Sequence, residues 1–177
     1  MIIRRVAVVG IVLAGMLALG GCDGSPAPAA STPPFASEEE AFAAAEETYR
    51  AYVDALNEVD LADPETFEPV FALTTGELHS SDVEGLTRYH ADGVTVSGAS
   101  RVDLIAPLGV DDEFSRIRVA VCLDVSTVNL LDRKGLSLVD PTRVDIQTLS
   151  VTVERAADNG TRLLVSAINP REGEPSC

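Results

Sequence analysis

Apolar and polar side chains alternate over residues 115–131, the longest uninterrupted alternation in the chain. Because successive side chains of a strand point to opposite faces, this pattern predicts a β-strand with one face in the core. The predicted core face consists of Ile117, Val119, Val121, Leu123, Val125 and Leu131. The opposite face consists of Arg118, Ala120, Cys122, Asp124 and Ser126. We expect the rest of the domain to be organised around this strand.

Three other segments in the C-terminal half have strand-like patterns, namely residues 94–108, 143–155 and 161–168. The last two are separated by Asp158-Asn159-Gly160, which is typical of a tight hairpin turn. Short connections of this kind favour antiparallel neighbours. The four strands are therefore predicted to form a meander.

Two of these strands should be irregular. In residues 94–108, one parity is shared by Val94, Val96, Val102, Leu104 and Leu108. Gly98 interrupts that row at a place where we expect a bulge or bend. In residues 143–155, Val144 and Ile146 are at even positions, whereas Leu149, Val151 and Val153 are at odd positions, so the apolar side chains change from one face of the strand to the other. This change predicts a bulge near Gln147 or Thr148, unless both faces of the strand are partly covered.

The first part of the domain follows helical spacing. Ser37, followed by glutamates at positions 38 to 40, predicts an N-cap with a capping box at the positive end of the helix dipole. The apolar stripe of this helix consists of Phe42, Ala45, Tyr49, Tyr52, Leu56 and Val59. We interpret Tyr49 and Tyr52 as core residues with satisfied hydroxyls rather than as ligand contacts.

Two further helical segments are expected before the strands. Asp63-Pro64 resembles an N-cap with a first-turn proline, but Pro69 interrupts a long helix, so residues 64–73 predict one or two helical turns. Residues 76–91 predict a helix that is capped by Thr75 and ended by Gly93. Three helical segments before four strands predict an α+β fold, with helices on one face of a curved, mainly antiparallel four-stranded sheet.

The N-terminus has the pattern of a secretory leader. Arg4 and Arg5 precede an apolar run, and that run is shorter than the roughly 20 residues of a transmembrane helix. Residues 1–21 are therefore predicted to be a signal peptide. Leu19-Gly20-Gly21-Cys22 resembles the bacterial lipobox, and this resemblance implies a thioether-linked diacylglycerol on Cys22.

Two alternatives to a lipoprotein remain open from the leader alone. One is a secreted protein cut near Gly20 with Cys22 as a stray thiol, and the other is an uncleaved signal anchor. Residues 22–36 are rich in Pro, Ala and Ser, so we expect a lipidated cysteine followed by a flexible tether. Residues 37–177 are expected to form a single domain, held by lipid at the extracytoplasmic face of the cell membrane.

The charge of the chain argues against a nucleic-acid partner, and its length argues against one class of lipoprotein. The 177 residues have a net charge of −15 at pH 7, and such a surface repels phosphate backbones, so we expect no nucleic-acid partner. The length leaves room for one domain after the leader. One lobe does not suit a solute-capturing lipoprotein of a transporter, because those proteins close two lobes around a hinge.

Few residues suggest catalysis. His79 and His90 share one stripe of the third predicted helix but stand roughly 16 Å apart, so they cannot bind one metal ion. In an enzyme, His90 would be the base, helped by Tyr89 or Asp103, although no spacing requires these residues to converge. The sequence has no nucleotide-binding loop, metal-ligand cluster or nucleophile motif, and it predicts no cofactor and no metal.

The acidic stretch at residues 111–113 could be mistaken for a calcium loop. It has neither the regular spacing of oxygen ligands nor the glycine of an EF-hand. We therefore interpret Asp111-Asp112-Glu113 as a solvated turn that leads into the strand at 115–131.

A family resemblance rests on the order of the elements and on several short motifs. The motifs lie at residues 72–76 (ALTTG), from Gly93 to Gly98, at 121–126 (VCLDVS), from Asp132 to Ser137, and at the terminal cysteine. Residues 70–177 resemble a group of uncharacterised actinobacterial lipoproteins. The long first helix followed by short helices and a meander resembles the NTF2-like (cystatin-like) fold. This resemblance implies a cone-shaped domain but no particular chemistry.

The cysteines suggest one covalent link. If Cys22 carries lipid, Cys122 and Cys177 are the remaining thiols, and only one pairing within the chain is possible. The oxidising compartment outside the membrane favours a disulfide, with two unpaired thiols as the alternative. The end of the chain, residues 170–177, has no apolar side chain that would otherwise hold it in place.

The sequence thus favours a lipid-anchored, non-catalytic domain that binds a protein partner or a small ligand. The alternative is an NTF2-like enzyme of the isomerase or dehydratase type with a cone-shaped pocket. Convergence of ionisable side chains in an open apolar pocket would favour the enzyme, whereas a filled cone would favour the binding protein.

Overall fold

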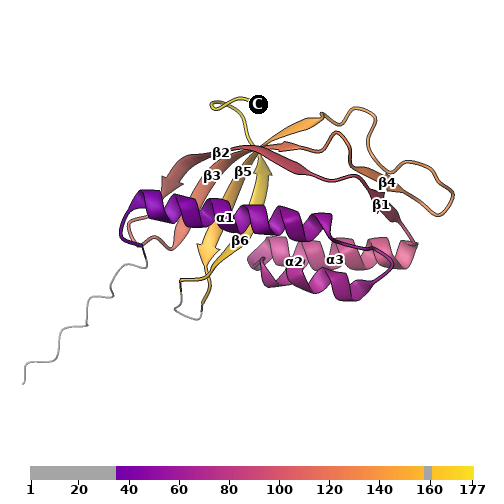
Figure 1. Ribbon diagram of the computed structural model, residues 1–177, viewed down its shortest axis with the longest axis horizontal. Helices are drawn as coiled ribbons and strands as arrows, with labels where there is room; N and C mark the ends of the chain where they lie inside the picture. Colours follow the sequence, from indigo (N-terminus) through magenta and orange to yellow (C-terminus); the bar gives the residue numbers. More distant parts are fainter. Residues whose placement is uncertain (1–34, 158–160) are drawn as a thin grey trace, which may run out of the picture. The chain divides into compact units, whose positions relative to one another are not determined.

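A central sheet of four strands forms the back of the molecule (Figure 1). The computed structural model describes residues 35–157 and 161–177. The strands are β2 (Arg101–Val110), β3 (Arg116–Asp124), β5 (Ile146–Arg155) and β6 (Leu163–Pro170). They lie in the order β2-β3-β5-β6, and each neighbouring pair is antiparallel. The predicted curved sheet with helices on one face is confirmed.

Strand β3 lies inside the sheet and supplies the centre of the core. Ile117, Val119 and Val121 are at most 1% exposed, and Val151 and Val153 of β5 are fully buried beside them. The pairing of β3 with β5 runs without a shift from Arg116 opposite Glu154 to Asp124 opposite Ile146. The predicted core face of β3 is confirmed over this length.

The prediction of four long strands was wrong at one end of the sheet. Residues 94–108 and 115–131 are each divided, and their outer parts pair as β1 (Thr95–Ser97) and β4 (Asn129–Leu131) in a separate two-stranded sheet. Gly98 breaks the first segment with a positive φ of 80°. Asp124 breaks the second, because its carboxylate accepts a hydrogen bond from the Ser126 N–H at 2.8 Å and so forms a turn.

The bend predicted at Gly98 is confirmed, but the bulges of the main sheet lie elsewhere than predicted. In β2, Asp103 and Leu108 are extra residues in the pairing with β3, so the predicted single parity fails: Leu104 is 37% exposed, while Ile105 packs against the core. No bulge interrupts β5 at Gln147 or Thr148. Its apparent phase change arises because the strand begins only at Ile146, which leaves Val144 outside it and 63% exposed.

Helix α1 (Glu38–Asn57) lies across the concave face and contacts all four strands of the main sheet (Figure 1). Ser37 caps it by accepting a hydrogen bond from the Glu40 N–H at 3.2 Å. The Glu40 carboxylate accepts from Ala36 at 2.7 Å, one residue earlier than in a capping box. Its buried residues are Ala41, Ala45, Tyr49, Tyr52 and Val53.

The other helical segments cover the β6 side of the sheet. They are the 3₁₀ turn η1 (Pro64–Phe67), α2 (Glu68–Ala72) and α3 (Gly76–Asp92). As predicted, Asp63 caps η1 and Gly93 ends α3 with a positive φ of 63°. Thr75 precedes α3 but makes no side-chain capping bond. Instead, its N–H donates to the Val165 carbonyl at 3.0 Å, which covers the outer edge of β6.

The packed part of the chain begins before Ser37. Phe35, which the predicted tether includes, is only 7% exposed and contacts Phe114 edge to face. The predicted signal peptide, Cys22 and the predicted turn at residues 158–160 lie outside the described residues. Among the helices that the structure describes, none combines the length and the apolar character needed to span a bilayer.

Candidate functional site

We call the space between α1 and the concave face of the main sheet the cone. It holds a small cavity. Its volume is about 160 Å³, smaller than the roughly 300–1,000 Å³ of most ligand pockets. Its lining comes from α1 and from the concave face, and consists of Tyr49, Tyr52, Val53, Leu56, Ser100, Leu123, Gln147, Leu149 and Ile168. The cone is therefore largely filled by its own side chains.

Two tyrosines contribute the ionisable groups of this cavity. Tyr49 and Tyr52 are 1% and 4% exposed, and the Tyr52 hydroxyl donates to the Asp82 carboxylate on α3 at 3.2 Å. Burial raises the pKa of both phenols, and the negative charge of Asp82 raises the pKa of Tyr52 further. Both hydroxyls therefore remain protonated at neutral pH. The Tyr49 hydroxyl can donate a hydrogen bond to a ligand, whereas the Tyr52 hydroxyl already donates to Asp82, and neither can remove a proton from a ligand.

Asp82 is the one member of this cluster that the sequence did not indicate. Burial raises the pKa of its carboxyl group, while the hydrogen bond from Tyr52 and the nearby His79 oppose that shift. Asp82 lies three residues after His79 on α3, so the helical period places it on the same side. This spacing could have indicated that Asp82 lies on the same face as His79. Nothing in the sequence, however, indicated that this face of α3 packs against Tyr52.

Both histidines have structural partners on neighbouring elements. His79 Nδ1 lies 3.2 Å from the Thr74 hydroxyl, and its ring contacts Phe71 edge to face. His90 Nδ1 lies 2.8 Å from the Leu61 carbonyl. Because a carbonyl only accepts, Nδ1 of His90 must carry the proton. These contacts orient both rings for packing.

The residues predicted for a possible enzyme are not brought together in the cone. None of His90, Tyr89 and Asp103 lines the cavity. The Tyr89 ring lies beneath the guanidinium of Arg88, and Asp103 forms an ion pair with Arg101 at 2.8 Å on the edge strand β2.

The acidic turn before β3 has a structural role. The Asp111 carboxylate accepts hydrogen bonds from the Ser115 N–H at 2.7 Å and from the Ser115 hydroxyl. Partial desolvation raises the pKa of Asp111, but the hydrogen bonds from Ser115 and Arg116 outweigh it and hold the pKa below its ordinary value. Within residues 35–157 and 161–177, no three His, Cys, Asp or Glu side chains form a group able to hold a metal ion.

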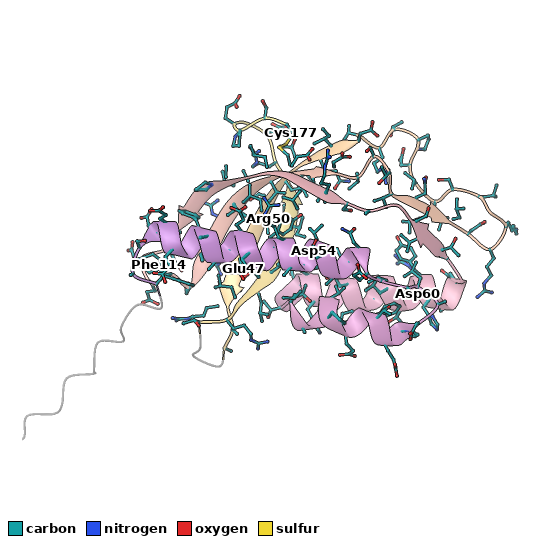
Figure 2. The ribbon with its side chains drawn as sticks, viewed as in Figure 1. Glu47, Arg50, Asp54, Asp60, Phe114 and Cys177 are labelled. Atoms are coloured by element: carbon teal, nitrogen blue, oxygen red, sulfur yellow. A yellow bond between two sulfur atoms is a disulfide. The ribbon has the colours of Figure 1, made fainter. Side chains whose placement is uncertain are left out.

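A larger hollow lies on the outside of α1, and we call it the α1–β2 groove. Its volume is about 430 Å³. The apolar floor consists of Phe42, Ala43, Ile105, Pro107 and Val119, and the acidic rim consists of Glu38, Glu39 and Glu46. A second hollow of about 470 Å³ continues along α1 past Glu47, Arg50 and Asp54 (Figure 2).

The far end of α1 is joined to the residue that precedes β2. The Asn57 side chain donates to the Ser100 carbonyl at 2.9 Å and accepts from the Ser100 N–H at 2.8 Å. Arg50 pairs with Glu46 at 2.9 Å. Glu38 and Glu39 lie in the first turn of α1, where the helix dipole favours negative charge, and neither forms an ion pair with a described residue.

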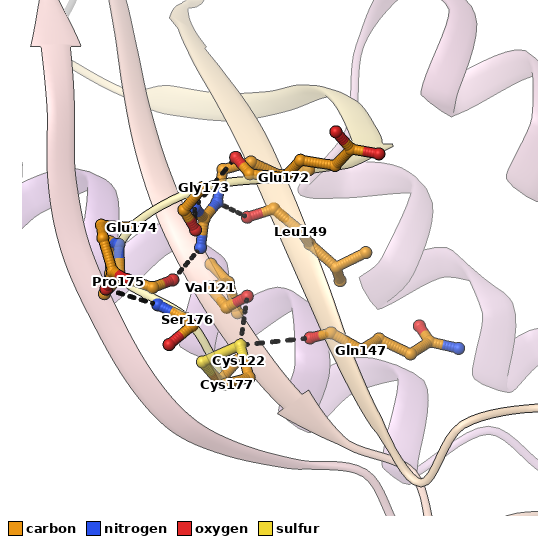
Figure 3. The surroundings of a disulfide bond; sticks show 11 residues. Val121, Cys122, Gln147, Leu149, Glu172, Gly173, Glu174, Pro175, Ser176 and Cys177 are labelled. Atoms are coloured by element: carbon orange, nitrogen blue, oxygen red, sulfur yellow. Dashed lines mark hydrogen bonds between the residues drawn. A yellow bond between two sulfur atoms is a disulfide. The ribbon is translucent and has the colours of Figure 1, made fainter.

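The end of the chain returns to the convex side of β3 (Figure 3). Cys122 and Cys177 are joined, with a Cα–Cα distance of 5.6 Å, which supports the predicted pairing. The prediction that only the sulfur holds this tail was wrong. The Arg171 N–H donates to the Thr148 carbonyl at 2.9 Å, and its guanidinium donates to the carbonyls of Leu149, Gly173 and Pro175.

Comparisons with known proteins show the fold. No family model matches the sequence. The intermembrane space region of the chloroplast protein ARC6 has a TM-score of 0.51 at 13% identity, covering 73% of this chain and 95% of that one. A putative aromatic ring hydroxylase from Novosphingobium aromaticivorans has a TM-score of 0.46 at 14% identity, covering 76% and 96%. The similarity to the ARC6 region shows that the two chains share a fold, which here is an α+β arrangement with helices on one face of a four-stranded antiparallel sheet.

One curated protein is similar in sequence. The DNA replication and repair protein RecF of Shewanella piezotolerans is 32% identical over 145 residues, which covers 70% of this chain. The chain spans only 40% of the length of that relative.

Proposed function

We propose that this protein is a lipid-anchored, extracytoplasmic domain that binds a protein partner and is not a catalyst. The observation that carries this proposal is the contrast between the small cavity of the cone and the larger α1–β2 groove on the surface. The cone is reduced to about 160 Å³ and has two buried tyrosines as its ionisable groups. The exposed α1–β2 groove is larger, at about 430 Å³, and combines an apolar floor with a charged rim. A floor and rim of this kind are typical of protein interfaces.

The proposed anchor is the diacylglycerol on Cys22, at the end of a signal peptide formed by residues 1–21. A disulfide between Cys122 and Cys177 suits the oxidising side of the membrane. DNA is a poor candidate partner despite the sequence similarity to a DNA repair protein. A net charge of −15 opposes binding to a phosphate backbone.

The enzyme alternative would depend on Tyr49, Tyr52 and Asp82. A catalytic base in this cone would need a pKa near the working pH, whereas burial moves the tyrosines away from it. The Tyr52 hydroxyl is also already engaged by Asp82. The geometry therefore favours a structural role for this pair, which joins α1 to α3.

We expect a variant with His79→Gln, His90→Gln and Tyr49→Phe to restore the wild-type phenotype in a deletion strain, because no catalytic step needs these groups. The circular dichroism spectrum should match that of the wild type. If the variant has an unchanged spectrum but fails to restore the wild-type phenotype, the non-catalytic proposal is contradicted.

We expect Cys22→Ala to move the protein from the membrane fraction to the soluble fraction, or to leave the leader uncut. The acyl chains supply the binding energy, at about 0.8 kcal/mol per buried methylene. Detergent phase partitioning of the two forms is the measurement. If the wild type already partitions into the aqueous phase, the anchor is absent. Ser31→Ala, a change in the tether, is the control and should leave partitioning unchanged.

A further inference from the structure

A hairpin at one end of the domain presents apolar side chains to solvent. We call residues 129–138, which comprise β4 and the segment that returns beside it, the distal arm. Leu136 is 62% exposed and Leu138 is 49% exposed. Large apolar side chains with this exposure on one short segment are typical of an interaction surface.

The distal arm is well ordered by its own hydrogen bonds. The Asp132 N–H donates to the Leu136 carbonyl at 2.9 Å, and the Leu138 N–H donates to the Leu130 carbonyl at 2.8 Å. Arg133 ties the arm to α3 through the Ala91 carbonyl at 2.6 Å. The two leucines are therefore held in a fixed position, which lowers the entropy lost on binding.

The tip of the arm carries positive charge in an acidic protein. Lys134 is the only lysine of the chain, and it is exposed. It forms no ion pair with a described residue. The arm thus combines a free cation with two exposed leucines. The α1–β2 groove has the complementary features, an apolar floor and the carboxylates of Glu38 and Glu39, for which no ion pair is seen among the described residues.

One molecule cannot bring these two surfaces together. Figure 1 shows β4 and the loop after it at the opposite end of the domain from the start of α1. The protein's own tether is a poor occupant of the groove, because residues 23–36 contain no lysine or arginine. A second molecule can supply the arm.

We propose that the distal arm of one molecule docks in the α1–β2 groove of a second copy. Leu136 and Leu138 lie on the apolar floor, and Lys134 faces Glu38 and Glu39. The two surfaces are unlike, so a pair of molecules can make the contact twice, or successive copies can form a chain. The inference rests on the proposed partner-binding function and names the partner.

Zero-length cross-linking with a carbodiimide tests this contact, because the reagent joins a lysine to a carboxylate that it touches. The full chain, purified in mild detergent, is used as an equal mixture of natural and ¹⁵N-labelled protein. We expect a peptide pair that links Lys134 to Glu38 or Glu39, with half of the pairs isotopically mixed. The yield should fall as salt rises, since salt screens exposed charges.

Matched variants define the surfaces. Ala43 and Ala72 are both exposed helix positions, so Ala43→Arg fills the groove and Ala72→Arg is its control. We expect Ala43→Arg, and separately Leu136→Ser with Leu138→Ser, to lower the cross-link yield about tenfold, because each removes the apolar contact. Val144→Ser, which changes a residue that is 63% exposed outside the arm, should leave the yield unchanged.

Two outcomes would overturn the inference. They are a Lys134 link found only in unmixed isotopic pairs, and a link to carboxylates outside the groove. The proposed function has its own readout. If Ala43→Arg abolishes complementation of the deletion strain while the wild type shows no self-cross-link, the groove binds a different protein. The proposed function then stands, and the identification of a second copy as the partner is wrong.

Discussion

Cys122→Ser is expected to lower the midpoint of thermal unfolding by about 10 °C. The two cysteines are 55 residues apart, and closing a loop of this size contributes about 4 kcal/mol through the unfolded chain. For a domain of this size, each kcal/mol shifts the midpoint by about 3 °C. Differential scanning calorimetry without reductant measures the change. The tail should become more mobile, although Arg171 still holds part of it to β5.

Cys177→Ser is the matched control for this prediction. It removes the same bond at an exposed position, whereas Cys122 is only 4% exposed, so a serine there also buries a hydroxyl. We expect Cys177→Ser to lose slightly less stability, and reductant to bring the wild type to the same midpoint. Thiol labelling of the denatured, unreduced protein gives the decisive count. Reactive thiols at both Cys122 and Cys177 would show that the bond is absent.

The core of the sheet could be predicted because its signal is local. In β3, apolar residues at every second position face α1, and the pairing with β5 follows them without a shift. The turn signals were also local, since Asp63, Pro64 and Gly93 determine their own backbone geometry. Fold class follows from such patterns once the helices precede the strands.

The second sheet could not be predicted, because its cause lies between segments distant in the sequence. A row of alternating residues continues past Asp124, yet the chain turns there, and residues Asn129–Leu131 pair with β1 instead of β2. A strand pattern shows which residues share a face, but not where a strand changes its partner. The bulge at Asp103 shifted the faces of β2 for the same reason.

The candidate site shows the same limit. Tyr49 and Tyr52 were correctly interpreted as core residues, but Asp82, the hydrogen-bond partner of Tyr52, lies on another helix, 30 residues away. The contacts of Arg171 with backbone carbonyls likewise depend on where the tail crosses β5, and an arginine in a polar tail gives no hint of them. The α1–β2 groove also depends on where α1 crosses β2 and β3, since its floor combines Phe42 with Ile105 and Val119.

Gly98→Ala is expected to destabilise the domain by about 3 kcal/mol, because it strains the backbone and also creates a clash. Gly98 has a φ of 80°, which costs an L-residue about 1–2 kcal/mol, and overpacking adds about 1–3 kcal/mol. A methyl group here would overlap the backbone carbonyl of Thr127. This residue is held in place because the Thr127 hydroxyl donates to the Ala99 carbonyl at 2.9 Å.

Gly135→Ala is the control, since Gly135 has a φ of 77° and no atom within 4 Å of the new methyl group. We expect it to cost only about 1 kcal/mol in urea unfolding. An equal loss of stability in both variants would show that strain alone, and not the contact between Gly98 and Thr127, holds the junction of the two sheets.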